Sequence, residues 1–122
     1  MTIQKTGRID KWGPKIFLGS AAGDIASVCL TAPDKSGSFA EQTQGIFGVI
    51  DELLAQMGTD RTALIYAQVW LAGIEHWPDF VPLWNDWVGT DHAPGLSVVE
   101  MAASRRDSRL EIRVWADRPA AA

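Results

Sequence analysis

Three residues of this sequence have side chains suited to acid–base or nucleophilic chemistry: Glu100, His92 and Cys29. Glu100 alternates in step with Leu96 and Val98, so if those two face a cleft, its carboxyl group faces it too and can act as an acid or base on a polarised double bond. His92 lies in the loop TDHAPG, and an imidazole can donate or accept a proton in acid–base chemistry. The alternatives are that Glu100 is a solvated carboxylate and His92 an exposed loop side chain.

Cys29 is the only cysteine, and a thiol becomes a nucleophile where nearby cations lower its pKa. Its surroundings, IASVCLTAP, supply no cation, which favours a small buried apolar side chain. One cysteine excludes an internal disulfide, and the two histidines lie too far apart for the spacing of a zinc site. We therefore expect no metal and no cofactor.

The composition narrows the class of protein. Hydrophobic residues make up 47% of the 122 residues and charged residues 21%, which is typical of a globular protein, so we expect one domain over residues 1–122. A net charge of −4 without a basic stripe argues against nucleic acid as a partner. No apolar run approaches the roughly 20 residues that span a bilayer, and the N-terminus lacks a signal-peptide core. These features predict a cytoplasmic protein with no membrane partner.

The stretch 38–58 predicts a long amphipathic helix. Ser38 followed three residues later by Glu41 is the capping-box pattern of a helix start. Apolar residues then recur at steps of three and four, and Gly58 can take the left-handed conformation that ends a helix. The predicted buried face consists of Ile46, Ile50, Leu53, Leu54 and Met57. The same spacing predicts a second helix over 77–88, with Pro78 near its first position.

Strands are predicted from β-branched and alternating apolar residues over 2–5, 15–18, 25–31, 63–71, 96–102 and 109–116, with a turn over 19–24. A strand that follows a helix joins its sheet by a right-handed crossover, so both helices should cover one face. The other face would stay open, which favours a symmetric oligomer in which sheets meet. Of six tryptophans, five lie after residue 69; we expect some in the core and others at subunit contacts or a cleft wall.

Seven stretches occur in a fixed order between residues 23 and 116: GDIASVCLTAP, EQTQGIFGVIDELLAQMG, ALIYAQVWLAG, WNDWV, HAP, VVEMA and LEIRVWA. In this order they resemble the RidA/YjgF family of reactive-intermediate deaminases, formerly called endoribonuclease L-PSP-like. The resemblance implies an α+β, chorismate-mutase-like fold: a mixed sheet with two helices on one face. It also implies a homotrimer whose sheets form a central barrel, with three clefts between subunits.

Deaminases of this family hydrolyse enamines or imines made from amino acids, and an arginine two positions after the loop proline grips the substrate carboxylate. A guanidinium suits that task because it donates two parallel hydrogen bonds. Here Pro94 is followed by Gly95 and Leu96, so the anchor is replaced by an apolar side chain. Other pocket positions of the family also differ here, and are occupied by Cys29, Leu30, Val81, Val98 and Arg113.

Arg113 stands where the family has a glutamate that shares the cleft with the missing arginine. One hypothesis is that Arg113 binds an anionic ligand in its place, and the alternative is a surface arginine paired with Glu111 or Glu100. Two functions follow. The chain is either a RidA-type hydrolase for an enamine-like or imine-like metabolite other than the standard 2-aminoacrylate, or a non-catalytic trimer that holds a metabolite or a partner protein. In the first case Glu100 and His92 are the catalytic candidates.

Overall fold

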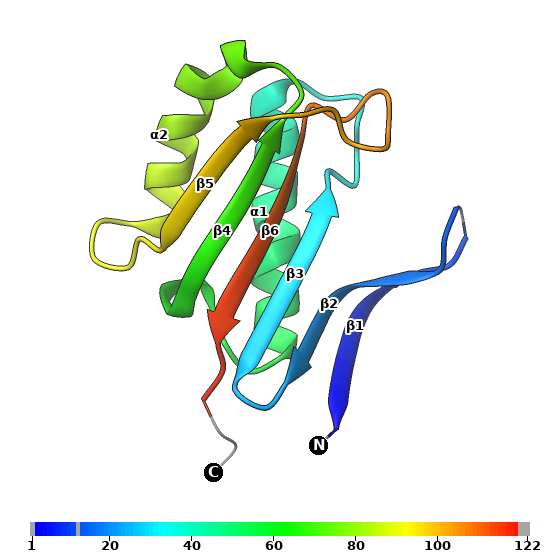
Figure 1. The fold of residues 1–122 in the computed structure, drawn as a ribbon, viewed down its shortest axis with the longest axis vertical. Coiled ribbons are helices and arrows are strands. Elements are labelled where there is room, and N and C mark those ends of the chain that lie inside the picture. Colours follow the sequence, from blue (N-terminus) through cyan, green and yellow to red (C-terminus); the bar gives the residue numbers. More distant parts are fainter. Residues whose placement is uncertain (1, 12, 120–122) are drawn as a thin grey trace.

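The computed structural model describes residues 2–11 and 13–119. Six strands form one sheet in the order β1-β2-β3-β6-β4-β5 (Figure 1). Neighbouring strands are antiparallel except for β4 and β5, which are parallel, so the sheet is mixed as expected. The elements are β1 (Ile3–Ile9), β2 (Ile16–Ala22), β3 (Ile25–Thr31), α1 (Phe39–Gln56), η1 (Arg61–Ala63), β4 (Leu64–Leu71), η2 (Ile74–His76), α2 (Trp77–Val88), β5 (Gly95–Glu100) and β6 (Leu110–Asp117).

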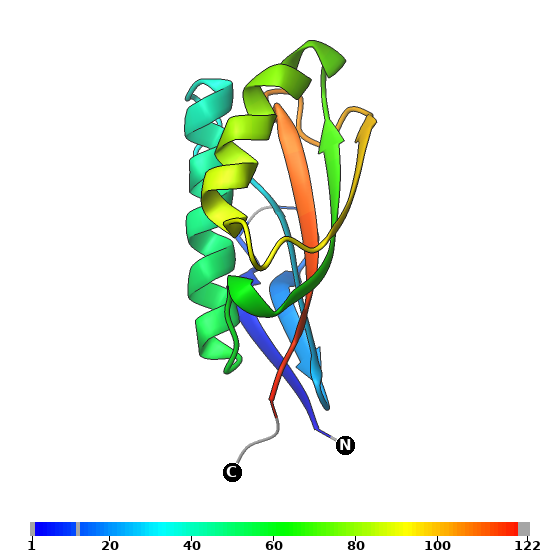
Figure 2. The ribbon, with the colours of Figure 1, turned by 90° about the vertical axis from the view of Figure 1, so that its left-hand side faces the viewer.

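Both helices pack on the same face of the sheet, which confirms the predicted α+β arrangement (Figure 2). Between the two layers lies the hydrophobic core. Its fully buried members include Ile46, Phe47, Ile50 and Leu54 from α1, and Val28, Val69, Ile112 and Val114 from the central strands. No helix within the described residues is both long and apolar enough to cross a membrane.

Helix α1 begins as the sequence predicts. The backbone N–H of Glu41 donates to Ser38 Oγ over 3.2 Å, and the N–H of Ser38 donates to Glu41 Oε1 over 2.9 Å. The hydrogen bond from the Ser38 backbone N–H, and then the Ser38 side chain, lower the pKa of the Glu41 carboxyl group, because they favour its charged form. The helix ends at Gln56, and Gly58 follows with φ at +84°, a conformation that glycine adopts without strain.

Helix α2 spans Trp77–Val88 as predicted and tolerates Pro82 in its interior. It packs on α1 through aromatic rings: Phe47 and Trp87 stack in parallel with centroids 4.2 Å apart. Trp87 Nε1 also donates to Asp51 Oδ1 over 3.1 Å, which satisfies a largely buried indole N–H. This contact holds α2 at the side of the sheet where β5 forms the edge.

The N-terminal strands are longer than predicted. β1 extends to Ile9 rather than residue 5, and β2 continues to Ala22 rather than residue 18. The predicted turn over 19–24 is therefore wrong in its first part, and the turn is confined to Gly23 and Asp24. Small residues obscured the strand. A Cβ at position 19 would lie 3.0 Å from Thr6 Cγ2 and 3.1 Å from Met57 Cε, which is tighter than an ordinary contact, and Ala21 is buried.

Candidate functional site

A hollow of about 300 Å³ lies beside the edge strand β5, lined by Ile74, Trp77, Leu96 and Val98. The four residues come from three elements: η2, the start of α2, and β5. Trp77 and Ile74 are 42% and 52% exposed, unusually open for such large apolar side chains, whereas Leu96 and Val98 are half-buried against the core. The predicted ligand-site residues Leu96 and Val98 thus share one apolar hollow.

The strand register explains which way these side chains lie. In the parallel pair of β4 and β5, Leu96 is level with Ala67 and Val98 with Val69. Ala67 and Val69 are fully buried under the helices, so Leu96 and Val98 belong to the same, helix-covered face. Because β5 is an edge strand, that face is only partly covered at its position, and a hollow remains.

Glu100 contacts one of the residues that line the hollow. Its Oε2 accepts the backbone N–H of Ile74 over 2.7 Å, which fixes the start of η2 against the end of β5. The carboxylate is exposed, and Glu100 is not among the residues that line the hollow. The structure therefore gives Glu100 a positional role beside the hollow: it holds Ile74, one of the lining residues.

Arg113 lies on the other face of the sheet. It is level with Cys29 of β3 and Gln68 of β4, whose side chains alternate away from the helices. Its guanidinium carbon lies 5.7 Å from the ring centroid of Trp115, in cation–π range. Among the described residues, Arg113 forms no ion pair with a carboxylate, neither with Glu111 nor with Glu100. Within one subunit, Arg113 and Leu96 are not brought onto one face.

Cys29 is half-buried on the same helix-free face, and its Sγ donates to Glu111 Oε2 over 3.4 Å. Burial raises the pKa of this thiol, and the negative charge of Glu111 raises it further, outweighing the opposite effect of Arg113. A raised pKa keeps the sulfur protonated at neutral pH, which is the reverse of what a nucleophilic cysteine needs.

The remaining candidates lie apart from the hollow's lining. His92 is exposed in the loop between α2 and β5, and Val81 is half-buried on α2, one helical turn after Trp77. Within residues 2–11 and 13–119, no cluster of three or more His, Cys, Asp or Glu side chains is arranged to hold a metal ion.

Sequence reasoning missed Ile74 and placed Trp77 only as a helix residue. Both belong to a short connection whose path depends on the packing of α2, so no periodic pattern marks them. The sequence feature that could have indicated them is the large number of tryptophans. In the structure Trp84 and Trp87 are buried in the core, whereas Trp77 lines the hollow.

Comparison with known proteins gives this arrangement its context. A family model described as Endoribonuclease L-PSP matches residues 20–118, which include both helices and every strand from β3 onward. The chain belongs to the RidA/YjgF family. The match covers the hollow as well as the sheet, so Leu96 stands inside the region that defines the family.

Relatives within the RidA/YjgF family are distant. A RutC family protein of Haemophilus ducreyi is 29% identical over 83 residues, which are 68% of this chain and 71% of the relative. One from Haemophilus influenzae is 30% identical over 76 residues, 62% of this chain and 66% of the relative. The structure of NMB1025, a YjgF family member from Neisseria meningitidis, superposes with a TM-score of 0.87 at 23% identity, covering 99% of this chain and 98% of that one. At that identity the likeness establishes the fold.

Proposed function

We propose that this RidA/YjgF-family protein binds a small, largely apolar metabolite at the hollow beside β5 and does not deaminate amino-acid-derived imines. The observation that carries the proposal is Leu96. It stands where the family's deaminases have their carboxylate-binding arginine, and it lines the hollow together with Val98, Ile74 and Trp77. None of these four side chains carries a charge, so affinity would come from burying apolar ligand surface, at roughly 25 cal/mol per Å².

The charge beside the hollow also disfavours a carboxylate ligand. Glu100 is held next to Ile74 by the hydrogen bond to its backbone N–H. A ligand carboxylate entering the hollow would approach this like charge and lose its own hydration, without a guanidinium to compensate. An uncharged ligand avoids both costs.

The arrangement supports a binding role more than hydrolysis. A general acid or base must come within hydrogen-bond reach of the reacting atom. Glu100 already engages a backbone N–H, and His92 is an exposed loop residue outside the hollow's lining. A non-catalytic role is therefore the conclusion that we favour among the two functions expected from the sequence.

The homotrimer implied by the family resemblance is part of the proposal. The helix-free face of the sheet carries Tyr66, which is 40% exposed, and the half-buried Trp115, with ring centroids 5.8 Å apart. An aromatic pair next to Arg113 has the composition of an interface core. Sedimentation at micromolar concentration tests this part of the proposal, and a monomer would contradict it.

The decisive experiment compares two ligands that differ in one group, p-cresol and p-hydroxybenzoate, by methyl NMR of Leu96 and Val98. We expect p-cresol to shift these methyl signals and p-hydroxybenzoate to leave them unchanged. A Leu96→Arg variant should reverse the preference, because the guanidinium supplies the missing carboxylate partner. Equal binding of both compounds by the native protein would refute the apolar-site proposal.

The second part of the proposal, that the protein does not deaminate imines, is tested separately with an enzymatically generated 2-iminopropionate substrate. We expect no acceleration of its hydrolysis by the native protein while an arginine-containing family member, run as the positive control, is active. Activity of the native protein would show that another residue anchors the carboxylate, and would overturn the exclusion of imine chemistry.

A further inference from the structure

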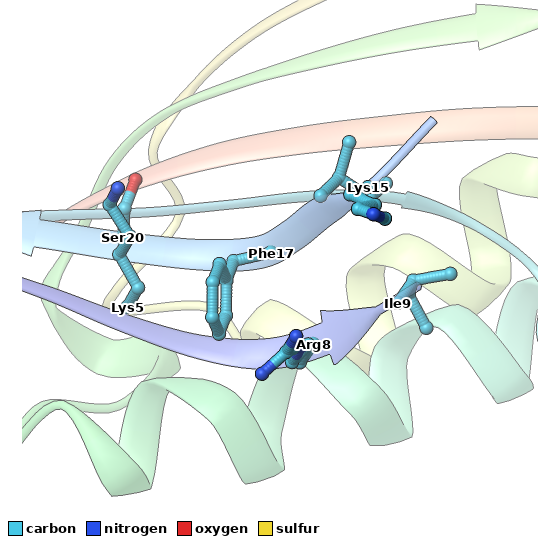
Figure 3. Close-up of a pocket in the computed structure, with 7 residues that line it drawn as sticks. Lys5, Arg8, Ile9, Lys15, Phe17 and Ser20 are labelled. Atoms are coloured by element: carbon cyan, nitrogen blue, oxygen red, sulfur yellow. The ribbon is translucent and has the colours of Figure 1, made fainter. Parts of the chain in front are cut away.

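A second and larger hollow lies at the opposite edge of the sheet, on the hairpin formed by β1 and β2. Its volume is about 500 Å³, within the range of small-molecule sites. The lining combines three cations with apolar side chains and one hydroxyl group: Lys5, Arg8, Lys15, Ile9, Ile16, Phe17 and Ser20. In Figure 3 the Phe17 ring lies between Lys5 and Arg8, with Ile9 and Lys15 toward the end of the hairpin.

The register of the hairpin places charged and apolar groups side by side. Arg8 is level with Phe17 across the strand pair, and Lys5 is level with Ser20. Directly opposed residues of an antiparallel pair have Cβ atoms about 4.5–5.5 Å apart, so each of these cations has a cross-strand partner that also lines the hollow. The hollow is therefore built by strand pairing and not by a flexible loop alone.

Basic residues outnumber acidic residues in the sequence of this hairpin. Residues 1–15 contain four of the eleven lysines and arginines but only one of the fifteen acidic residues, in a chain whose net charge is −4. That acidic residue, Asp10, pairs with Arg8 through Nε over 2.9 Å. Among the described residues, neither Lys5 nor Lys15 has a carboxylate within ion-pairing distance. A concave surface with like charges focuses the field and attracts counter-ions.

We propose that this hollow binds a small organic anion with an apolar body, such as an aryl carboxylate or aryl phosphate. The anionic head is held by Lys5, Lys15 and Arg8, and the body packs on Phe17 and Ile16. The positive charge alone would attract any anion. However, three of the seven lining side chains are large and apolar, and Ile16 and Phe17 are each more than 40% exposed. An inorganic ion would leave that apolar surface in water. This site is independent of the proposed function at β5, which lies at the other sheet edge.

The test uses backbone-amide NMR of the full chain with four probes: phenylacetate, phenyl phosphate, the neutral phenylacetamide, and inorganic phosphate. We expect both aryl anions to shift the amides of Lys15 and Phe17, and the phenylacetamide and inorganic phosphate to bind at least tenfold more weakly. Comparison of the two aryl anions shows which head group the hollow prefers. Raising the salt from 50 to 300 mM should weaken anion binding several-fold, because exposed charges are screened.

Variants then assign the contacts. A Lys5→Gln/Lys15→Gln double variant should bind phenylacetate about tenfold more weakly, since an exposed ion pair contributes up to about fivefold. Phe17→Ser should weaken the aryl anions and leave inorganic phosphate unchanged. Arg105→Gln removes an exposed cation outside the hairpin and serves as the matched control, with no expected effect.

Three results would overturn the proposal. The first is equal binding of phenylacetamide and phenylacetate. The second is phenylacetate binding that persists unchanged in the double variant. The third is a double variant whose sedimentation coefficient falls while its ligand binding is retained, which would assign the hairpin to contact with a second copy of the chain. A further result, shifts confined to Leu96 and Val98, would place the anion at β5 and would contradict both this proposal and the proposed function.

Discussion

Replacing Gln42 by leucine should destabilise the protein by about 3–4 kcal/mol. Gln42 is a fully buried polar side chain of α1. Its Nε2 donates to the carbonyl groups of Lys35, Gly37 and Asp107 over 3.1, 3.4 and 3.2 Å, and its Oε1 accepts the backbone N–H of Arg109 over 3.0 Å. One amide thus joins the loop before α1 to the loop before β6.

The magnitude follows from these contacts. Because Nε2 has two hydrogens, its three carbonyl partners share two hydrogen bonds, and the bond from Arg109 makes about three in total. A typical intramolecular hydrogen bond contributes about 1 kcal/mol, and buried partners left unsatisfied add to this, which gives about 4 kcal/mol in total. Water can reach the exposed residues Asp107 and Arg109, so part of this cost is recovered. For a chain of this size, a loss of about 3–4 kcal/mol lowers the melting temperature by about 10–20 °C.

Urea and thermal unfolding at one fixed protein concentration measure the effect, because association changes apparent stability. Gln44→Leu is the matched control: the same chemical change, two residues along the same helix, at an exposed position. Gln42→Glu keeps the acceptor for Arg109 and loses the donor, so it should also be destabilised. The reasoning fails if Gln42→Leu costs less than about 1 kcal/mol more than Gln44→Leu.

Two further predictions concern the sites. Burial and Glu111 raise the pKa of Cys29, so alkylation by iodoacetamide should reach half its maximal rate only above the ordinary thiol pKa of about 9, and Glu111→Gln should move this midpoint down. A folded-state pKa above the unfolded value means that the contribution of Cys29 to stability is present below about pH 9 and is lost as the pH rises through the folded pKa. An unchanged midpoint in Glu111→Gln would contradict this account. Glu100→Ala should speed amide exchange at Ile74 severalfold, while Glu52→Ala, an exposed glutamate on α1, should not.

Most helices and strands could be predicted from the sequence because each depends on a local periodicity of apolar residues. The capping box at Ser38 and Glu41, the buried face of α1, and the bounds of α2 all follow from residues within a few positions of one another. The predicted strand ended too early because Gly19 and Ala21 have little β-propensity, and the close approach of Thr6 and Met57 at Gly19 is visible only in the structure. Tertiary packing decided that segment against local preference.

The residues of the candidate site at β5 also fall into two groups: some could be predicted from the sequence, and others could be found only in the structure. The sequence could suggest, from the family resemblance, that Leu96 stands at the position of the family's arginine, and it shows Leu96, Val98 and Glu100 at every second position of one strand. The sequence could not show that Ile74 and Trp77 lie beside Leu96 and Val98, because these two residues reach β5 only through the packing of η2 and α2. Nor could it show the position of Arg113 on the face opposite Leu96, which depends on pairing between β4, β5 and β6.

Sequence alone therefore determined most of the elements, their order and the family resemblance, and it led to the prediction that the carboxylate anchor is missing. Only the tertiary structure decided which side chains meet: the apolar hollow at β5, and the cationic hollow where Lys5 and Arg8 lie across from Ser20 and Phe17. The physical reason is that periodicity within an element is set by its own backbone geometry. A strand register, by contrast, is set jointly by two chain segments, and a shift of one residue would move every side chain to the other face.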